Sequence, residues 1–79
     1  MAHIRYFAGA AEAASTTAET VSALSLGELK AALSRRHGAE FDRVLGRCSL
    51  LVNGRHTTDA AAPLVETDTV DVLPPFAGG

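Results

Sequence analysis

The residues best placed to do chemistry are the last two, Gly78 and Gly79. Because glycine has no side chain, two in a row make the thinnest possible backbone and leave the terminal carboxylate sterically open. Such an end can pass, extended, through a channel that excludes every other residue. Pro74 and Pro75 precede it; since proline fixes φ and donates no backbone hydrogen, we expect them to end a strand and direct the chain beyond it. The pattern predicts that residues 75–79 form a tail that presents Gly79 to a reaction.

The remaining chemically capable residues do not form a recognisable catalytic group. Cys48 is the single cysteine, which rules out an internal disulfide and fits a reducing compartment; we expect it to be a small, buried apolar residue. His3, His37 and His56 are dispersed, without the spacing of metal ligands on a helix or hairpin, so we expect surface histidines and no metal site. The catalytic groups for any reaction at Gly79 are therefore expected in partner proteins.

Length and composition restrict the class of protein. A chain of 79 residues, 47% hydrophobic and 20% charged, is typical of one small globular domain, which we place at residues 1–74 ahead of the tail. The net charge of −2 gives no case for nucleic-acid binding. No apolar run approaches membrane length, and the amino terminus does not resemble a signal peptide. We expect a cytoplasmic protein with neither nucleic acid nor membrane as a partner.

The clearest predicted element is a helix that begins at Ser25 and ends at Gly38. Ser25 and Glu28 form a capping-box pattern, and apolar residues recur at helical spacing after them. Alternation and β-branched residues predict strands at residues 3–7, 20–24, 48–52, 55–58 and 69–73. Asn53-Gly54 predicts a tight hairpin turn between two of them. We expect residues 41–45 to form a short helical turn, and residues 9–18 to be a mobile loop with at most one helical turn.

The order of these elements predicts the fold class. An amino-terminal hairpin, one crossing helix and three further strands give an α+β protein with a ubiquitin-like β-grasp, in which a mixed sheet of about five strands packs on one main helix. The last strand then delivers an extended C-terminal tail.

Three motifs give a family resemblance. Arg5-Tyr6-Phe7-Ala8 near the start, Val52-Asn53-Gly54 in the middle and the final stretch from Val70 to Gly79 together resemble the small subunit of molybdopterin synthase. That family shares its fold and tail with the thiamine-pathway sulfur carrier. One departure is Glu66-Thr67-Asp68, where the family usually has Gly-Asp, so we expect a different turn geometry at Thr67.

The resemblance implies a carrier function. A ubiquitin-activating-type adenylyltransferase would use ATP to adenylate Gly79, and a sulfur donor would convert the adenylate to a thiocarboxylate. Pro75, Phe76, Ala77 and Gly78 would enter the large synthase subunit, where sulfur passes to a cyclic pterin precursor. The resemblance also implies a heterotetramer and no cofactor bound to this chain.

Sheet geometry predicts where such a partner would dock. If Ile4, Tyr6, Val70 and Val72 face the helix, the residues of opposite parity lie on the open face of the sheet. We expect a partner interface made of Phe7, Leu51, His56 and Leu73. Apolar side chains on an exposed face beside the tail are typical of an interaction site.

Three alternatives remain open. The same thiocarboxylate could serve thiamine or amino-acid sulfur assimilation. Gly79 could instead form an isopeptide bond with a substrate lysine, as in ubiquitin-like conjugation, although Lys30 is the only lysine on which this chain could build a polymer. The third alternative is a binding module with an inert tail.

Overall fold

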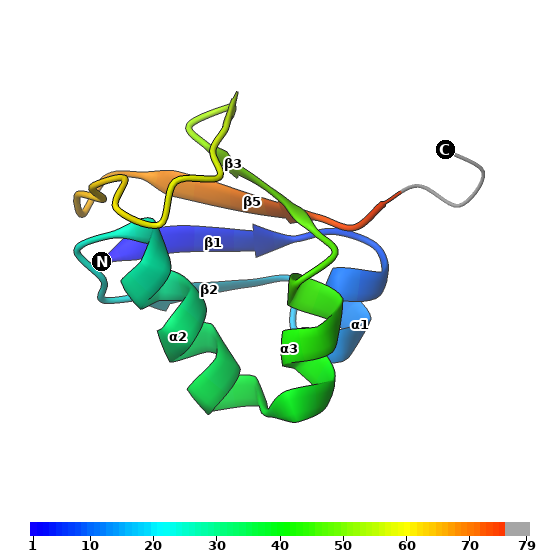
Figure 1. Cartoon of the computed structure of the whole chain (residues 1–79). Coiled ribbons are helices and arrows are strands. Elements are labelled where there is room, and N and C mark those ends of the chain that lie inside the picture. The colour runs from blue at the N-terminus through cyan, green and yellow to red at the C-terminus, as the bar shows by residue number, and fades with distance from the viewer. Residues whose placement is uncertain (76–79) are drawn as a thin grey trace.

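The computed structural model describes residues 1–75, which form one mixed sheet with helices on one of its faces (Figure 1). The strands are β1 (Ala2–Tyr6), β2 (Ala18–Val21), β3 (Ser49–Val52), β4 (Arg55–His56) and β5 (Thr69–Leu73). The helices are α1 (Gly9–Ala14), α2 (Leu26–His37) and α3 (Ala39–Leu45). This confirms the predicted α+β class and the ubiquitin-like β-grasp, with α2 as the longest helix.

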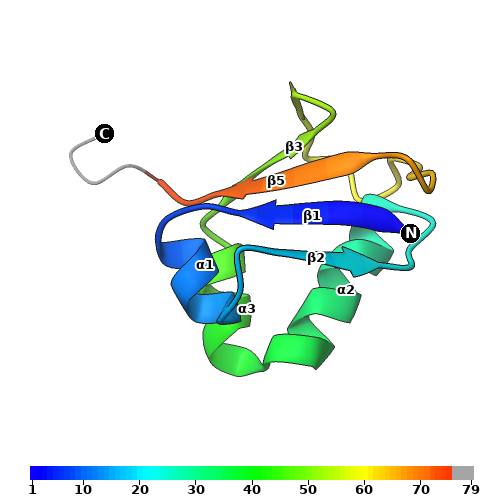
Figure 2. The ribbon, with the colours of Figure 1, turned by 180° about the vertical axis from the view of Figure 1, so that it is seen from behind.

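The strand that leads to the tail lies at the centre of the sheet. The order is β2-β1-β5-β3-β4, and β5 pairs in parallel with β1 on one side and antiparallel with β3 on the other. The outer pairs β1–β2 and β3–β4 are antiparallel, and Figure 2 shows β1 and β2 running in opposite directions. Both neighbours of β5 therefore fix its position, and with it the point where the tail begins.

Helix α2 forms where the capping pattern predicts it. The Ser25 hydroxyl accepts a hydrogen bond from the Glu28 amide at 3.2 Å, satisfying one of the free donors of the first turn. Among the hydrogen bonds of the described residues, the reciprocal bond from the Glu28 side chain is not formed. Leu26, Leu29 and Leu33 are fully buried against the sheet, and Gly38 ends the helix with φ of +94°, where other residues are strained.

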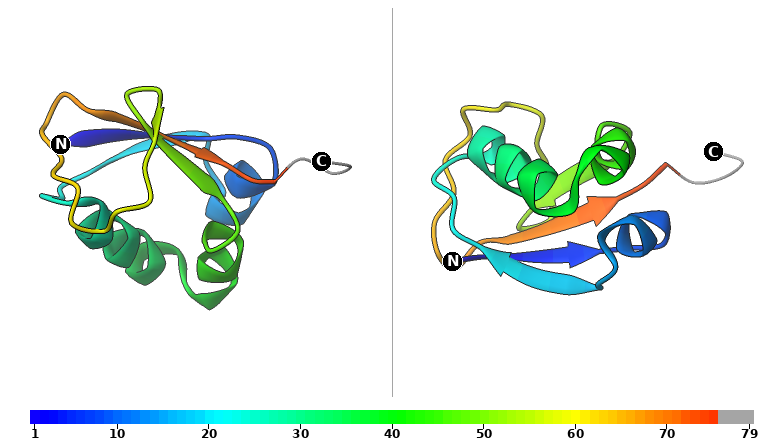
Figure 3. Two further views of the ribbon diagram at one scale, coloured as in Figure 1. Left: turned by 45° about the horizontal axis from the view of Figure 1, so that its top comes forward. Right: turned by 90° about the horizontal axis from the view of Figure 1, so that it is seen from below.

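The expectation of a mobile loop at residues 9–18 is wrong, because Gly9–Ala14 forms helix α1. The segment is rich in alanine, the best helix former, and Ala10 and Ala14 lie one turn apart and are buried. Helix α1 packs against α3, and the left panel of Figure 3 shows the two helices side by side. Strand β2 begins at Ala18, two residues earlier than predicted, and ends at Val21.

The side chain of Asn53 joins two turns by hydrogen bonds: the turn between β3 and β4, and the turn that precedes β5. Asn53 and Gly54 have φ of +51° and +83°, as a tight hairpin requires. Asn53 donates to the Asp68 carboxylate at 2.8 Å and accepts from the Thr69 amide at 3.0 Å. Thr67 does not have positive φ, so the turn before β5 does not need the glycine usual in the family. The different turn geometry expected at Thr67 stays a prediction.

Four polar side chains form a hydrogen-bonded cluster on the helix side of the sheet. We call it the Glu19 cluster; its members are Tyr6, Glu19, Arg36 and His37. The Glu19 carboxylate accepts hydrogen bonds from the Tyr6 hydroxyl at 2.5 Å and from Arg36 at 2.5 Å, and its oxygen lies 2.6 Å from Nε2 of His37. The rings of Tyr6 and His37 also pack around buried Phe41. The prediction of a surface position for His37 is wrong, since its side chain is 13% exposed.

Candidate functional site

The site is the end of β5 and the surfaces around it. Leu73 is the last residue of the strand, and Pro74 and the exposed Pro75 follow it at the edge of the molecule. Proline cannot donate to a ladder, which explains why pairing stops there. The chain therefore leaves the sheet at a fixed point and away from its core (Figure 1). The predicted tail residues Phe76, Ala77, Gly78 and Gly79 lie outside the residues that the structure describes.

The predicted parity of the sheet is confirmed. The side chains expected to face the helices are all buried, with exposed fractions of 4% or less: Ile4, Tyr6, Val70 and Val72. Leu51 and Leu73 alternate with buried neighbours and lie on the opposite, open face. His56 pairs directly with Leu51, and Leu73 with Ser49, so three strands contribute to one surface.

Phe7 completes this surface at the tail end. Its side chain is 40% exposed, and its amide donates to the Val72 carbonyl at 3.2 Å, which extends the pairing with β5 beyond β1. The Phe7 carbonyl accepts from the Ala10 amide at 3.0 Å, closing a tight turn in which Ala8 has φ of +50°. That backbone region is rare for a residue with a side chain. The turn fixes Phe7 between the sheet and α1.

The centre of the open face holds an ion pair that the sequence analysis did not single out. Arg5 donates twice to Asp71, with Nε–Oδ1 at 2.6 Å and Nη2–Oδ2 at 2.9 Å, and its guanidinium carbon lies 6.0 Å from the centre of the Phe7 ring. The hydrogen bonds and charge of Asp71 raise the pKa of Arg5. Strand alternation gives only the outward positions of Arg5 and Asp71, and the parallel pairing of β1 with β5 brings the two side chains together.

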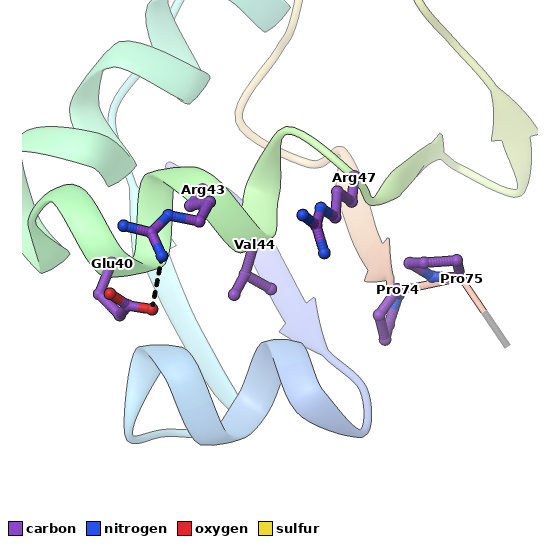
Figure 4. Close-up of a pocket in the computed structure, with 6 residues that line it drawn as sticks. All are labelled: Glu40, Arg43, Val44, Arg47, Pro74 and Pro75. Atoms are coloured by element: carbon purple, nitrogen blue, oxygen red, sulfur yellow. Dashed lines mark ion pairs between the residues drawn. The ribbon is translucent and has the colours of Figure 1, made fainter. Parts of the chain in front are cut away.

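A second surface borders the tail on the helix side, and we call it the α3 hollow. It has a volume of about 380 Å³ and is lined by Glu40, Arg43, Val44, Arg47, Pro74 and Pro75 (Figure 4). Arg43 lies on α3 and Arg47 just after it, while the prolines belong to the chain that leads to the tail. The predictions from sequence missed this site, because neither arginine follows a motif and only the fold brings them beside Pro74 and Pro75.

The surroundings of the other chemically capable side chains indicate a structural and not a catalytic role. The Cys48 thiol is half-buried and donates to the Val44 carbonyl at 3.2 Å, and its burial raises its pKa, which disfavours the thiolate. Within residues 1–75, no three histidine, cysteine or acidic side chains gather as metal ligands would. None of the helices in that range is long and apolar enough to cross a membrane.

Comparison with solved structures shows the same fold in several proteins. SAMP1 from Haloferax volcanii superimposes with a TM-score of 0.84 at 25% identity, over 99% of this chain and 98% of that one. A complex of subunits 1 and 2 of the molybdopterin-converting factor from Helicobacter pylori gives 0.77 at 26% identity, over 99% and 97%. A putative molybdopterin converting factor subunit 1 from Pyrococcus furiosus gives 0.83 at 22% identity, over 95% and 97%, a likeness of fold alone.

Sequence comparison identifies the family. No curated protein sequence matches this chain significantly. The profile of the ThiS family, however, matches residues 4–79, which is nearly the whole chain and includes the diglycine end. The chain therefore belongs to the ThiS family of ubiquitin-like sulfur carriers.

Proposed function

We propose that this protein carries sulfur as a thiocarboxylate on Gly79 and donates it as the small subunit of molybdopterin synthase. The observation that supports this most directly is the course of β5, a central strand that two prolines follow and that leads the chain out beside an exposed, partly apolar face. Membership of the ThiS family and the likeness to a molybdopterin-converting complex support the same reading.

The proposed chemistry takes place on the terminal carboxylate. A carboxylate oxygen of Gly79 attacks the α-phosphorus of ATP in the active site of a ubiquitin-activating-type adenylyltransferase, which releases pyrophosphate and forms an acyl adenylate. A sulfur donor then displaces AMP and leaves a thiocarboxylate. This group is a soft nucleophile, and after the sulfur has been transferred to the cyclic pterin precursor an ordinary carboxylate remains that can be activated again. This chain supplies the reacting end, and the partners supply ATP binding and catalysis.

The partner would bind along the open face and take up the tail. The Helicobacter pylori complex joins a subunit of this fold to a second subunit, which supports a larger partner here. Leu51, His56 and Leu73 are proposed contact residues because they lie on the open face, and Phe7 is added because its exposed ring lies beside them at the tail end of the sheet. Pro75, Phe76, Ala77 and Gly78 would pass through the entry to the partner's active site, in the heterotetramer that the family resemblance implies.

The first experiment is the intact mass of the protein isolated from its native host, with the C-terminal fragment sequenced. We expect a fraction of molecules in which one oxygen of Gly79 is replaced by sulfur. A matched sample with one residue added after Gly79 should never show that mass. If the terminus remains a plain carboxylate after incubation with ATP, a sulfur donor and host extract, the carrier function is wrong.

A second assay separates the sulfur pathways. Thiocarboxylated protein mixed with the host's large subunit should convert the cyclic pterin precursor to molybdopterin. Sulfur transfer to a thiamine precursor or an amino-acid acceptor instead would identify one of the alternative carrier functions.

Conjugation is the second candidate, because the Gly78-Gly79 carboxylate could form an isopeptide bond; a small archaeal modifier protein from Haloferax volcanii shares the fold, with a TM-score of 0.80 at 24% identity. A tagged chain expressed in the host would then form isopeptide-linked products between Gly79 and lysine side chains. Ladders that disappear when Gly79 is removed would support conjugation, and their absence would favour the carrier function alone.

A further inference from the structure

The α3 hollow combines an apolar floor with a basic rim. Val44, Pro74 and Pro75 supply the apolar side chains, while Arg43 and Arg47 supply the basic ones, the first on α3 and the second just past its end (Figure 4). A hollow with this lining suits a side chain that has an apolar stem and a negative end. Aspartate and glutamate fit that description, because guanidinium groups bind carboxylates through paired hydrogen bonds.

The charge on this rim is not neutralised within the described part of the chain. Arg47 forms no ion pair with any residue of 1–75. Arg43 approaches Glu40 at 3.7 Å, but both side chains are more than two-thirds exposed, so solvent screens the pair. Arg5 and Arg36, by contrast, hold carboxylates at 2.6 Å and 2.5 Å. Two poorly compensated positive charges therefore line the same hollow, in a chain with a net charge of −2.

The position of the hollow identifies what can cover it. Pro74 and Pro75 form one wall, and the chain continues from Pro75 into the tail. A protein that takes up the tail must therefore bring the rim of its entry channel against these two prolines, and the same rim then lies over Arg43 and Arg47. The α3 hollow and the open face lie on opposite sides of β5 and would form one continuous interface around the tail.

We propose that the α3 hollow binds an acidic side chain on the rim of the large subunit that receives the tail, with Arg47 as its principal contact. Arg43 adds a second contact when it turns away from Glu40. This inference rests on the proposed function, since it assumes a partner that takes up the tail. It adds to it a basic contact on the helix side, which gives the partner a fixed orientation around β5.

The test is a calorimetric titration of the full-length chain with the large subunit from the same host. We expect Arg47→Glu to weaken binding roughly tenfold or more, because it removes an attraction and places two carboxylates together. The affinity of the native chain should also fall more steeply with added salt than that of Arg47→Glu. Arg35→Glu, an equal change of charge at an exposed position of α2, serves as the matched control and should leave binding unchanged.

A second variant should change the affinity for the large subunit in the opposite direction. Glu40→Gln removes the carboxylate that competes for Arg43, so binding should strengthen by roughly twofold to threefold. A role of Arg47 in folding alone would not give this result. Thermal unfolding of each variant confirms that the fold is intact.

The outcomes separate this inference from the proposed function. If the native chain binds and both Arg47→Glu and Glu40→Gln bind equally well, the acidic contact is wrong and the carrier function stands. If the native chain neither binds the large subunit nor transfers sulfur to the pterin precursor, both are wrong. Weakening by Arg47→Glu together with strengthening by Glu40→Gln would establish the contact.

Discussion

The two faces of the sheet use the same kind of ion pair for different purposes. β1 sends Tyr6 to the helix side, where Glu19 accepts hydrogen bonds from three side chains of the Glu19 cluster and joins β1, β2 and α2. The preceding residue, Arg5, points to the open face and pairs with Asp71 alone. Glu19 thus ties the helix α2 to two strands, whereas Asp71 joins only the neighbouring strands β1 and β5 on a face that no helix covers. We infer that contacts on the helix side provide most of the stability of the fold, and that the open face is available for a partner.

The sharpest test compares two neighbouring residues of β5, beginning with the buried one. Val72 is fully buried on the helix side, and Val72→Asp places a carboxylate there without a partner. We expect a loss of about 4 kcal/mol or more, enough to unfold a small domain. Circular dichroism would measure the loss of helix signal. A folded Val72→Asp variant would show that the helix side tolerates charge and would remove the basis of the comparison.

The next residue should behave in the opposite way. Leu73→Asp changes a side chain on the open face, so the fold should persist while affinity for the large subunit falls roughly 100-fold, as expected for an apolar contact at the centre of an interface. Calorimetric titration measures the affinity and thermal unfolding the stability. Thr20→Asp, on β2 at the far edge of the same face, is the matched control. Equal binding by Leu73→Asp and the native chain would place the interface elsewhere.

The Glu19 cluster should control stability and its dependence on pH. Burial alone would raise the pKa of Glu19, but hydrogen bonds from Tyr6, Arg36 and His37 outweigh it and lower the pKa below the usual 4.5. The stabilisation by the ionised carboxylate is thus complete above the unfolded pKa and is lost as pH falls through the lower, folded value. Glu19→Gln should cost about 1–3 kcal/mol at neutral pH.

The measurement is the unfolding temperature from neutral pH to below pH 4. The curves of the native chain and Glu19→Gln should converge at the acidic end, while affinity for the large subunit at neutral pH should not change. Glu12→Gln, at an exposed position of α1, is the control and should follow the native curve. A constant gap between the native chain and Glu19→Gln would contradict the role assigned to the carboxylate.

The smallest effect is expected for the ion pair on the open face. Arg5→Lys keeps the charge but loses the paired hydrogen bonds to Asp71, and because Arg5 is mostly exposed, the unfolding temperature should fall less than in Glu19→Gln. Salt screens exposed charges, so the difference from the native chain should shrink further at high ionic strength. A larger fall in the unfolding temperature that persists at high salt would mean that both faces contribute equally to the stability of the fold.

The sequence predicted the parts of the molecule that depend on local patterns. Ser25 caps its helix, Asn53-Gly54 forms the expected turn, and strand alternation placed Leu51 and Leu73 on the open face. The structure overturned predictions that depend on tertiary contacts. The alanines of residues 9–14 form a helix because they can pack against α3. No pattern near His37 in the sequence predicts that Glu19 is its partner.

Contacts between distant segments also explain why the candidate site was predicted only in part. The apolar residues of the open face follow from sheet parity. Arg5 and Asp71 meet only because β1 and β5 pair in parallel, and Arg47 reaches the tail exit only because α3 ends beside it. No periodicity encodes such pairings, since they join residues far apart in the sequence.

The central place of β5 also has a mechanical consequence. A partner that draws in or releases the tail pulls along the axis of this strand, and β5 is hydrogen-bonded along its length to β1 on one side and β3 on the other. A force in that direction loads both ladders in shear, so many bonds must yield together instead of opening one after another. The strand that presents the reacting end is thus also the part of the sheet best held against traction, and repeated insertion and withdrawal would leave the domain folded.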